Sequence, residues 1–306
     1  MSQIRFKGVY TAIVTPMKED GSVDEAALKN LIDFQIENGV AGIVPVGTTG
    51  ECPTLNHAEH NHVVEFVTKY VKQKNKNVQV IAGTGSNATS EAVSMTKHAK
   101  EAGADASLQV SPYYNKPTQE GLYKHFKKIG DEADLPLVIY NIQGRTGINI
   151  ETPTLMRLAK DCKNVVSVKE ASGNMSQMMD VITESRKLSK ATGRSFDVLS
   201  GDDNLTLPLI SLGGTGVISV ASNIAPKQMV DMVDAALKGD YETAQRIHYK
   251  LLPLLKIIFI ETNPIPVKTA LAMMGKCTEA FRLPLCEMKA ENKEKLRAVL
   301  KELKLI

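Results

Sequence analysis

A lysine follows a run of residues typical of a buried β-strand. Val165–Val168 contains three valines, and Lys169 comes directly after it. Burial among apolar side chains disfavours an ammonium ion, so a lysine held there would have a lowered pKa. Its neutral amine could then attack a carbonyl carbon near neutral pH. The run by itself favours a simpler interpretation, a strand-end lysine that reaches solvent, but other residues change that balance.

A short loop rich in glycine and threonine follows an earlier β-rich run. Gly47–Gly50 offers backbone N–H groups together with the hydroxyls of Thr48 and Thr49. Such a loop can bind a carboxylate or a phosphate. It is not a P-loop, because no Gly-Lys-Ser/Thr sequence follows. A strand-to-helix turn with capping hydroxyls is the alternative.

Tyrosines and an arginine also gather after β-rich runs. Tyr113, Tyr114 and Tyr140 are three of only eight tyrosines. A tyrosine that faces a lysine could relay a proton, although a buried tyrosine can equally belong to the core with its hydroxyl paired. Arg145 could hold a carboxylate through a bidentate pair, and the alternative is an arginine solvated in a loop.

Metal binding is not expected from the histidines and acidic residues. His57 and His60 would share a helix face, but no His-Glu-x-x-His pattern completes a ligand set. Asp202 and Asp203 follow a β-rich run beside a glycine, where a hydrogen-bonding role is favoured over cation binding. Cys52 could be exposed near the site, but nothing assigns it a general base.

The chain alternates β-rich runs with longer amphipathic segments, and this pattern predicts how the side chains are positioned. Such alternation favours parallel strands joined by crossover helices. Eight strands are predicted: Val9–Val14, Gly42–Val46, Val78–Ala82, Ala106–Val110, Leu137–Tyr140, Val165–Val168, Asp197–Leu199 and Gly216–Ser219. Eight repeats predict an α/β fold of the closed (β/α)8 TIM barrel type, with an open doubly wound sheet as the alternative. In a barrel the reactive residues would meet at the carboxyl ends of the strands.

Several residues are typical of helix ends. Asp24, Asn56 and Thr152 are predicted N-caps, since each has an oxygen-bearing side chain just before an amphipathic segment. Gly103 and Gly130 are predicted to end helices.

Strand patterns stop near Gly239. We therefore predict a barrel domain over residues 1–239 and a C-terminal helical appendix over 240–306, packed on the barrel because no flexible linker separates them. The apolar stretch Leu251–Ile260 is too short to cross a bilayer and is predicted to be a buried or interfacial helix. Asn263–Pro266 is predicted to be a turn.

Composition argues against several classes of protein. The 306 residues are 43% hydrophobic and 23% charged, as in a globular enzyme, and 37 basic against 34 acidic residues leave a net charge of +3. This balance argues against a nucleic-acid or membrane partner. Four cysteines without a Cys-x-x-Cys pair, and a start without the pattern of a signal peptide, favour a cytoplasmic location.

Taken together and in order, the motifs make the chain similar to a known family along essentially its whole length. It resembles the dihydrodipicolinate synthases, which stand with N-acetylneuraminate lyase among the class I pyruvate-dependent aldolases and lyases. The motifs that carry the resemblance are Gly47–Glu51, Tyr113–Pro117, Tyr140-Asn141, Arg145–Gly147, Val168–Glu170, Gly201–Asp203, Gly216–Ser219 and Asn263–Lys268.

The resemblance implies a reaction and a role for each matching residue. The enzyme would condense pyruvate with aspartate 4-semialdehyde to give 4-hydroxy-tetrahydrodipicolinate, the first committed step of lysine and diaminopimelate biosynthesis, with no metal or organic cofactor. Lys169 would form a Schiff base with pyruvate, and Thr49 with its neighbouring N–H groups would hold the pyruvate carboxylate. The other implied roles are a proton relay of Thr48, Tyr140 and Tyr114, the last reaching in from an adjacent subunit, a contact of Arg145 with the carboxylate of the second substrate, and a pocket lined by backbone atoms of Gly201 and Ile218.

Regulation and assembly are also implied by the resemblance. Many members are inhibited by L-lysine, and the matching positions are His57, His60, Asn87, Glu91 and Tyr113, which could equally form an ordinary polar contact between subunits. The family suggests a homotetramer built as a dimer of dimers. One departure affects the site, because Gln143 and Gly144 stand where the family usually has proline and serine, in the loop that positions Arg145.

Three other functions remain open at this point. A sister lyase acting on a sugar acid, such as N-acetylneuraminate or 2-keto-3-deoxygluconate, would share Lys169 and the carboxylate loop, but Arg145 suits a second small carboxylate better than a polyol. A pyridoxal-phosphate enzyme would also hold its cofactor as an imine on a lysine. A non-catalytic sensor or scaffold would not need this set of lysine, tyrosines and arginine.

Overall fold

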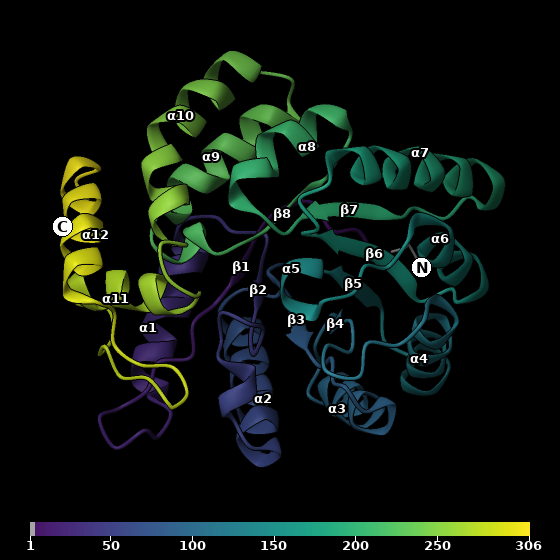
Figure 1. The fold of residues 1–306 in the computed structure, drawn as a ribbon, viewed down its shortest axis with the longest axis horizontal. Helices are drawn as coiled ribbons and strands as arrows, with labels where there is room; N and C mark the ends of the chain where they lie inside the picture. Colours follow the sequence, from purple (N-terminus) through teal and green to yellow (C-terminus); the bar gives the residue numbers. More distant parts are fainter. Residues whose placement is uncertain (1–3) are drawn as a thin grey trace.

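Eight parallel strands pair in chain order, and the last pairs back with the first, so that the sheet closes into a barrel. The computed structural model describes residues 4–306 (Figure 1). The strands are β1 (Gly8–Ala12), β2 (Gly42–Val44), β3 (Gln79–Gly83), β4 (Ala106–Val110), β5 (Leu137–Asn141), β6 (Val165–Glu170), β7 (Asp197–Ser200) and β8 (Gly216–Ser219). Each overlaps one predicted strand. The predicted TIM barrel is confirmed, and the open doubly wound alternative is wrong.

Helices follow the strands and form an outer layer around the barrel (Figure 1). The outer helices are α1 (Glu25–Glu37), α2 (His57–Lys74), α3 (Thr89–Glu101), α4 (Gln119–Ala133), α6 (Thr152–Asp161), α7 (Met175–Thr192), α8 (Thr206–Leu212) and α9 (Pro226–Leu237), whereas the single turn α5 (Gln143–Thr146) directly follows β5. Short 3-10 turns follow three strands: η1 (Cys52–Thr54), η2 (Asp203–Leu205) and η3 (Ala221–Asn223). The helical layer buries the outer face of the strands, as parallel sheets require.

Two of the three predicted N-caps are confirmed. The Asp24 carboxylate accepts a hydrogen bond from the Ala27 N–H at the start of α1, and Asn56 forms a capping box at the start of α2. The prediction for Thr152 is wrong, because Thr152 is itself the first residue of α6 and Glu151 takes the N-cap position. Pro153 therefore occupies the second helical position rather than the first. A proline is tolerated at either position, because the first N–H groups of a helix have no hydrogen-bond partner within it.

Of the two glycines predicted to end helices, one does so and the other does not. Gly103 follows α3 with φ +88°, a left-handed conformation that favours glycine, so that prediction is confirmed. Gly130 lies inside α4, which continues to Ala133. A Cβ at Gly130 would lie 2.3 Å from Cys162 Sγ, so this glycine allows α4 to pack closely on the segment after α6.

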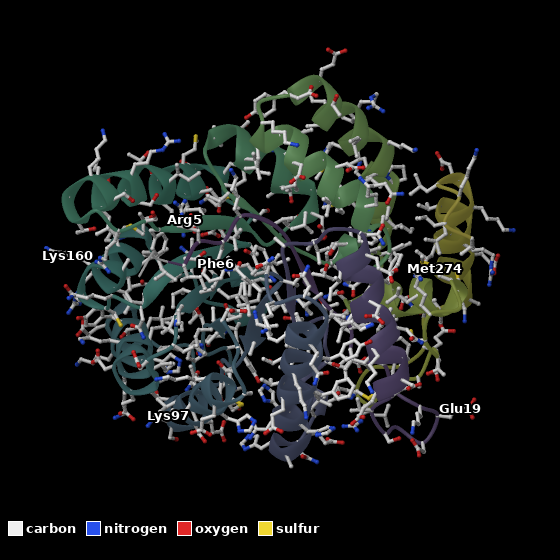
Figure 2. All side chains as sticks on the ribbon, turned by 180° about the vertical axis from the view of Figure 1, so that it is seen from behind. Arg5, Phe6, Glu19, Lys97, Lys160 and Met274 are labelled. Carbon is white, nitrogen blue, oxygen red and sulfur yellow. The ribbon has the colours of Figure 1, made fainter. Side chains whose placement is uncertain are left out.

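The amino-terminal segment closes the barrel at the end where the strands begin. Phe6, labelled with Arg5 in Figure 2, is fully buried, and its ring packs edge-to-face on Tyr10 with 5.9 Å between centroids. The Arg5 guanidinium pairs with Asp197, the first residue of β7, at 2.7 Å. Because this end is closed, a substrate is expected to enter from the opposite end, where the strands finish.

Three further helices complete the described chain: α10 (Tyr241–Ile257), α11 (Ile265–Met273) and α12 (Ala290–Glu302). They share one hydrophobic core with α1, α9 and the strands β1, β2, β3 and β8. Leu251, Leu254 and Leu255 of α10 are buried, so the stretch predicted to be a buried or interfacial helix is a buried one, although the helix ends at Ile257 rather than Ile260. Within residues 4–306, no helix is long and apolar enough to cross a membrane. Because the core is continuous, the proposed division of the chain at residue 239 stays a prediction.

Candidate active site

Lys169 lies inside the barrel at the carboxyl end of β6. It is 5% exposed, and its Nζ lies 4.1 Å from the centroid of the Tyr140 ring on neighbouring β5. Burial lowers the pKa of the Lys169 amine to about 7, the charge of Asp203 opposes that shift, and the charge of Arg145 adds to it. A large fraction of the amine is therefore neutral near pH 7. The interpretation of Lys169 as a strand end that reaches solvent is wrong.

An irregularity in β6 turns Lys169 toward the interior. Leu137 pairs with Val165, but the next residue of β5 pairs with Ser167, so β6 carries one extra residue at this point. Val165 and Val168 consequently both pack with the outer helices, whereas simple alternation would place them on opposite faces. Alternation resumes after this bulge, and Lys169 then faces inward.

The glycine-threonine loop follows β2 and lies beside Lys169. Thr49 is 2% exposed, and its Oγ1 accepts a hydrogen bond from Asn263 Nδ2 at 3.0 Å. The turn is closed by a hydrogen bond from the Gly50 N–H to the Gly47 carbonyl, 3.0 Å long. The same cavity is lined by Thr48, Thr49, Tyr140, Arg145 and Lys169. The barrel thus brings together the lysine, the carboxylate loop and the arginine that the sequence singled out.

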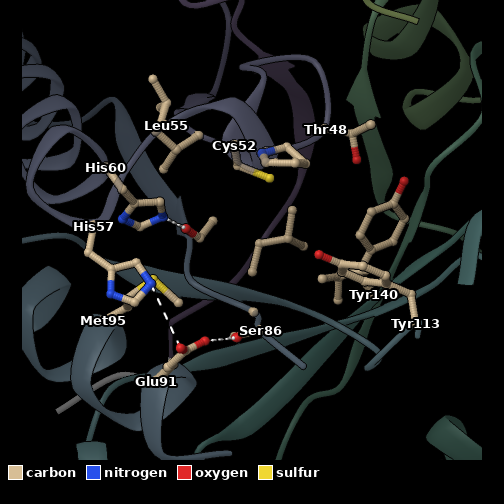
Figure 3. A pocket seen from close by; sticks show the side chains of 17 residues that line it. Thr48, Cys52, Leu55, His57, His60, Ser86, Glu91, Met95, Tyr113 and Tyr140 are labelled. Carbon is tan, nitrogen blue, oxygen red and sulfur yellow. Dashed lines mark hydrogen bonds and ion pairs between the residues drawn. The ribbon is translucent and has the colours of Figure 1, made fainter. Parts of the chain in front are cut away.

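Tyr140 is buried beside the Thr48 hydroxyl. Burial raises the pKa of the Tyr140 phenol to about 12, while the Arg145 charge and a hydrogen bond with Thr48 act in the opposite direction. Figure 3 shows Thr48 and Tyr140 facing the same cavity. A phenol that stays protonated at neutral pH can donate a proton and then recover it, as a relay requires.

Tyr114 lies away from Lys169 in the same chain. It is 88% exposed, on the segment after β4, and its backbone N–H is 3.4 Å from Asn87 Oδ1. An exposed tyrosine at this position is available to a neighbouring subunit. Its expected part in the proton relay stays a prediction.

Arg145 lies at the cavity mouth on α5, and it is exposed. Its Nη2 donates to the Asn263 carbonyl at 3.2 Å, which fixes the side chain on one side. A Cβ at Gly144 would meet nothing within 4 Å, so a serine would fit there as well. The unusual glycine therefore does not alter the packing of the loop.

Gly201 and Ile218 occupy different depths in the barrel. A Cβ at Gly201 would lie 3.0 Å from Lys169 Cε and 2.6 Å from Ala171 Cβ, so glycine makes room for the lysine side chain. Ile218 is fully buried in β8, and Val220, two residues later, lines the cavity.

Asp203 follows β7 and binds the end of β8 and the segment after it through hydrogen bonds. Its carboxylate accepts hydrogen bonds from Ser219 Oγ at 2.6 Å and from the Val220 and Ala221 N–H groups at 3.0 Å. The predicted hydrogen-bonding role is therefore confirmed. Burial raises the pKa of the Asp203 carboxyl, and its charge in turn raises the pKa of Lys169.

Asn263 is a residue of the site to which the sequence assigned no role. It lies two residues before the start of α11 and contacts both Thr49 and Arg145. The sequence placed Asn263 in a predicted turn over Asn263–Pro266 and in a motif shared with the family, and the turn is shorter than predicted, because Ile265 already belongs to α11. The contacts of Asn263 could not be predicted from the sequence, because they form only when α11 packs at the barrel mouth.

A second cavity, of about 230 Å³, adjoins the first and shares Thr48 and Tyr140 with it (Figure 3). Four of the five predicted lysine-site residues line it: His57, His60, Glu91 and Tyr113. The fifth, Asn87, accepts a hydrogen bond from the Tyr113 N–H at 2.7 Å. The structure therefore places the predicted lysine site next to the predicted proton relay.

Charged and polar groups line one side of the second cavity. His57 Nε2 lies 3.9 Å from Glu91 Oε1, and Ser86 Oγ donates to Glu91 at 2.5 Å. His60 Nε2 lies 2.8 Å from the Gly83 carbonyl, and burial lowers the pKa of this imidazole. A half-exposed carboxylate in such a cavity suits an ammonium group.

Cys52 also lines the second cavity, but it is half-buried rather than exposed. Burial raises the pKa of its thiol to about 12, so the thiolate needed for nucleophilic attack is scarce at neutral pH. Among residues 4–306, no group of three or more histidine, cysteine, aspartate or glutamate side chains is placed to hold a metal ion.

Comparison with known proteins connects this geometry to a family. The model of the dihydrodipicolinate synthetase family matches residues 5–303. The chain belongs to this family. A 4-hydroxy-tetrahydrodipicolinate synthase from Methanocaldococcus jannaschii is 55% identical over 301 residues, which cover 98% of this chain and 100% of that relative.

Two solved structures show what similar dihydrodipicolinate synthases bind. The chloride-inhibited enzyme from Acinetobacter baumannii, complexed with pyruvate, is 44% identical with a TM-score of 0.91, and the match covers 98% of this chain and 99% of that one. The enzyme from Cyanidioschyzon merolae, with lysine bound, is 41% identical with a TM-score of 0.91, and the match covers the same shares. The barrel described here is the fold of the dihydrodipicolinate synthetase family.

Proposed function

We propose that this protein condenses pyruvate with aspartate 4-semialdehyde to give 4-hydroxy-tetrahydrodipicolinate. The observation that carries the proposal is the buried amine of Lys169, which lies against Tyr140 beside the Thr49 loop in a chain of this family. The reaction is the first committed step of lysine and diaminopimelate biosynthesis, and we expect it in the cytoplasm.

The residues of the cavity support each step of this chemistry. The neutral amine of Lys169 attacks the keto carbon of pyruvate, and water leaves as the imine forms. The imine withdraws electrons, so a methyl proton leaves and an enamine results. The enamine carbon attacks the aldehyde carbon, and the hydroxyl oxygen that forms takes a proton through Tyr140 and Thr48. The amine of the second substrate then attacks the imine carbon, closes the ring and releases Lys169.

The imine replaces a cofactor in this scheme. Since it acts as the electron sink, we expect neither a metal ion nor pyridoxal phosphate to be needed. A colourless purified protein that turns over after dialysis against a chelator would support this expectation. An absorbance band of a bound pyridoxal imine would contradict it.

The alternative of a sugar-acid lyase is not favoured. The relatives at more than half identity are synthases by name, and a guanidinium at the cavity mouth suits a second small carboxylate. Assay of pyruvate with aspartate 4-semialdehyde, beside cleavage of N-acetylneuraminate and of 2-keto-3-deoxygluconate, tests the choice. Turnover of either sugar acid at the higher kcat/KM would overturn the proposal.

Replacing Arg145 with alanine is expected to weaken binding of the second substrate selectively. Loss of a charge-assisted bidentate contact raises the KM for aspartate 4-semialdehyde about 10- to 100-fold. Pyruvate imine formation, trapped with borohydride at about pH 8.5, above the pKa of Lys169, stays near wild type. Arg157→Ala, an exposed arginine of α6 paired with Glu120, is the matched control. Equal losses of pyruvate and semialdehyde binding would contradict the assignment.

Lysine is proposed to inhibit the enzyme at the second cavity, at an interface of a homotetramer built as a dimer of dimers. Glu91 would pair with an amino group of the inhibitor, so Glu91→Gln is expected to raise the half-inhibitory lysine concentration about tenfold, judged against the uninhibited rate of the same variant. Glu101→Gln, at the end of the same helix α3, is the control. Catalysis indifferent to millimolar lysine would show that the site is an ordinary polar contact.

A further inference from the structure

Glu51 and Lys268 form an ion pair that is completely removed from solvent. Lys268 Nζ donates to Glu51 Oε1 at 2.5 Å, and neither side chain has any exposed surface. Glu51 directly follows the Gly47–Gly50 loop, and Lys268 lies on α11. Neither residue lines the catalytic cavity. Any effect of the pair on the reaction is therefore transmitted through the loop beside it.

Stability alone does not account for this pair. Removing two charges from water is costly, and a well-packed apolar pair of the same size commonly stabilises a fold equally well or better. Burial lowers the pKa of Lys268 despite its partner, and Glu51 Oε2 has no hydrogen-bond partner. Glu51 also has φ +56°, in the left-handed region that residues other than glycine seldom adopt. The unpaired oxygen and the left-handed backbone both belong to Glu51, immediately after the carboxylate loop.

Two hydrogen bonds join this loop and the adjoining Glu51 to the segment that begins α11. Asn263 Nδ2 donates to Thr49 Oγ1 at 3.0 Å, and Lys268, five residues later, holds Glu51. On the other side, Thr15 Oγ1 donates to the Gly50 carbonyl at 2.7 Å. The Thr49 hydroxyl and the loop N–H groups are thus held from α11 on one side and from the segment after β1 on the other.

We propose that the buried Glu51–Lys268 pair is a positioning device that aims the Thr49 hydroxyl and the loop N–H groups at the carboxylate of the keto acid. This inference rests on the proposed function, because it assumes that the loop holds pyruvate. A directional ion pair fixes both the distance and the orientation of the loop against α11, whereas apolar contact tolerates sliding. Loosening the pair weakens keto-acid binding and leaves the Lys169 amine in place.

The test is the double variant Glu51→Met with Lys268→Met, which keeps the side-chain volumes and removes both charges. Its melting temperature is expected to stay near wild type. The pyruvate concentration that gives half-maximal borohydride trapping on Lys169 is expected to rise about tenfold, the cost of about one well-placed hydrogen bond to a charged group. The KM for aspartate 4-semialdehyde, measured at saturating pyruvate, is expected to change less than about twofold.

Matched controls separate the possible outcomes. Lys72→Met breaks a partly buried pair with Asp105, just before β4 at the opposite end of the barrel, and should leave pyruvate trapping unchanged. If the double variant does not fold, the double variant Glu51→Gln with Lys268→Gln, which keeps polar side chains at both positions without leaving an unpaired charge, is expected to shift the trapping midpoint about threefold or more. A folded variant that traps pyruvate at the wild-type concentration overturns the positioning role. Failure of the wild-type protein to trap pyruvate on Lys169 overturns the proposed function instead.

Discussion

Replacing Lys169 with alanine is expected to reduce turnover at least about 10⁴-fold, because the imine on this residue carries the whole reaction. Borohydride with pyruvate should add mass to the wild-type peptide that contains Lys169 and none to the same peptide of the variant. Lys163→Ala, an exposed lysine just before the opposite end of β6, should behave as wild type. Full turnover in the Lys169 variant would remove the basis of the proposed mechanism.

The rate of imine formation on Lys169 is expected to depend on pH with a midpoint that reflects the burial of this amine. Only the neutral amine attacks the keto carbon, and the pKa of Lys169 is lowered to about 7 by burial. The rate of imine formation should therefore rise about tenfold per pH unit below pH 7 and level off above it, whereas a solvated lysine would keep gaining up to about pH 10. Single-turnover trapping between about pH 5.5 and 10 measures the midpoint, and a midpoint near 10 would show that the amine is not desolvated.

Replacing Tyr140 with phenylalanine is expected to lower kcat about 10²- to 10⁴-fold, because the phenol is the group placed to move protons beside the amine. The ring is retained, so the wall against Lys169 is preserved. Pyruvate binding, measured as the midpoint of borohydride trapping at long incubation, should change far less than kcat. The comparison of steady-state rates with trapping yields separates proton transfer from substrate binding.

A second tyrosine inside the same barrel provides the control. Tyr10 lies at the closed end, where its hydroxyl donates to Gln79. Tyr10→Phe should cost some stability, since a half-buried acceptor loses its partner, and leave kcat near wild type. Equal losses of kcat in both variants would indicate a general effect on the fold rather than a proton relay through Tyr140.

Strands and helix ends were predictable from the sequence because interactions between neighbouring residues determine them. The eight strands were identified from β-branched runs, and the caps at Asp24 and Asn56 from side chains that satisfy the free N–H groups at a helix start. Gly103 ends a helix for an equally local reason, its positive φ. Gly130 has the same residue type but is required by a close contact with Cys162, which no local pattern reveals.

Contacts between distant segments account for the other differences. The sequence left open that Cys52 is exposed near the site, yet it lines a cavity formed with the ends of β3 and β4 and is half-buried. Asn263 is more than 200 residues from Thr49 along the chain and 3.0 Å from it in the fold. Such pairings depend on closure of the barrel and on the docking of α11, and neither is encoded in a single segment.

The sequence by itself determined the chemistry available to this protein: one lysine after a valine-rich strand, a threonine loop, a tyrosine and an arginine, each at the end of a strand. Only the tertiary structure decided that Lys169 points into the barrel. Simple alternation from Val165, which packs outward, would have turned Lys169 outward as well, and the extra residue in β6 reverses its direction. That direction places the amine where water is excluded, and exclusion of water is what makes it a nucleophile.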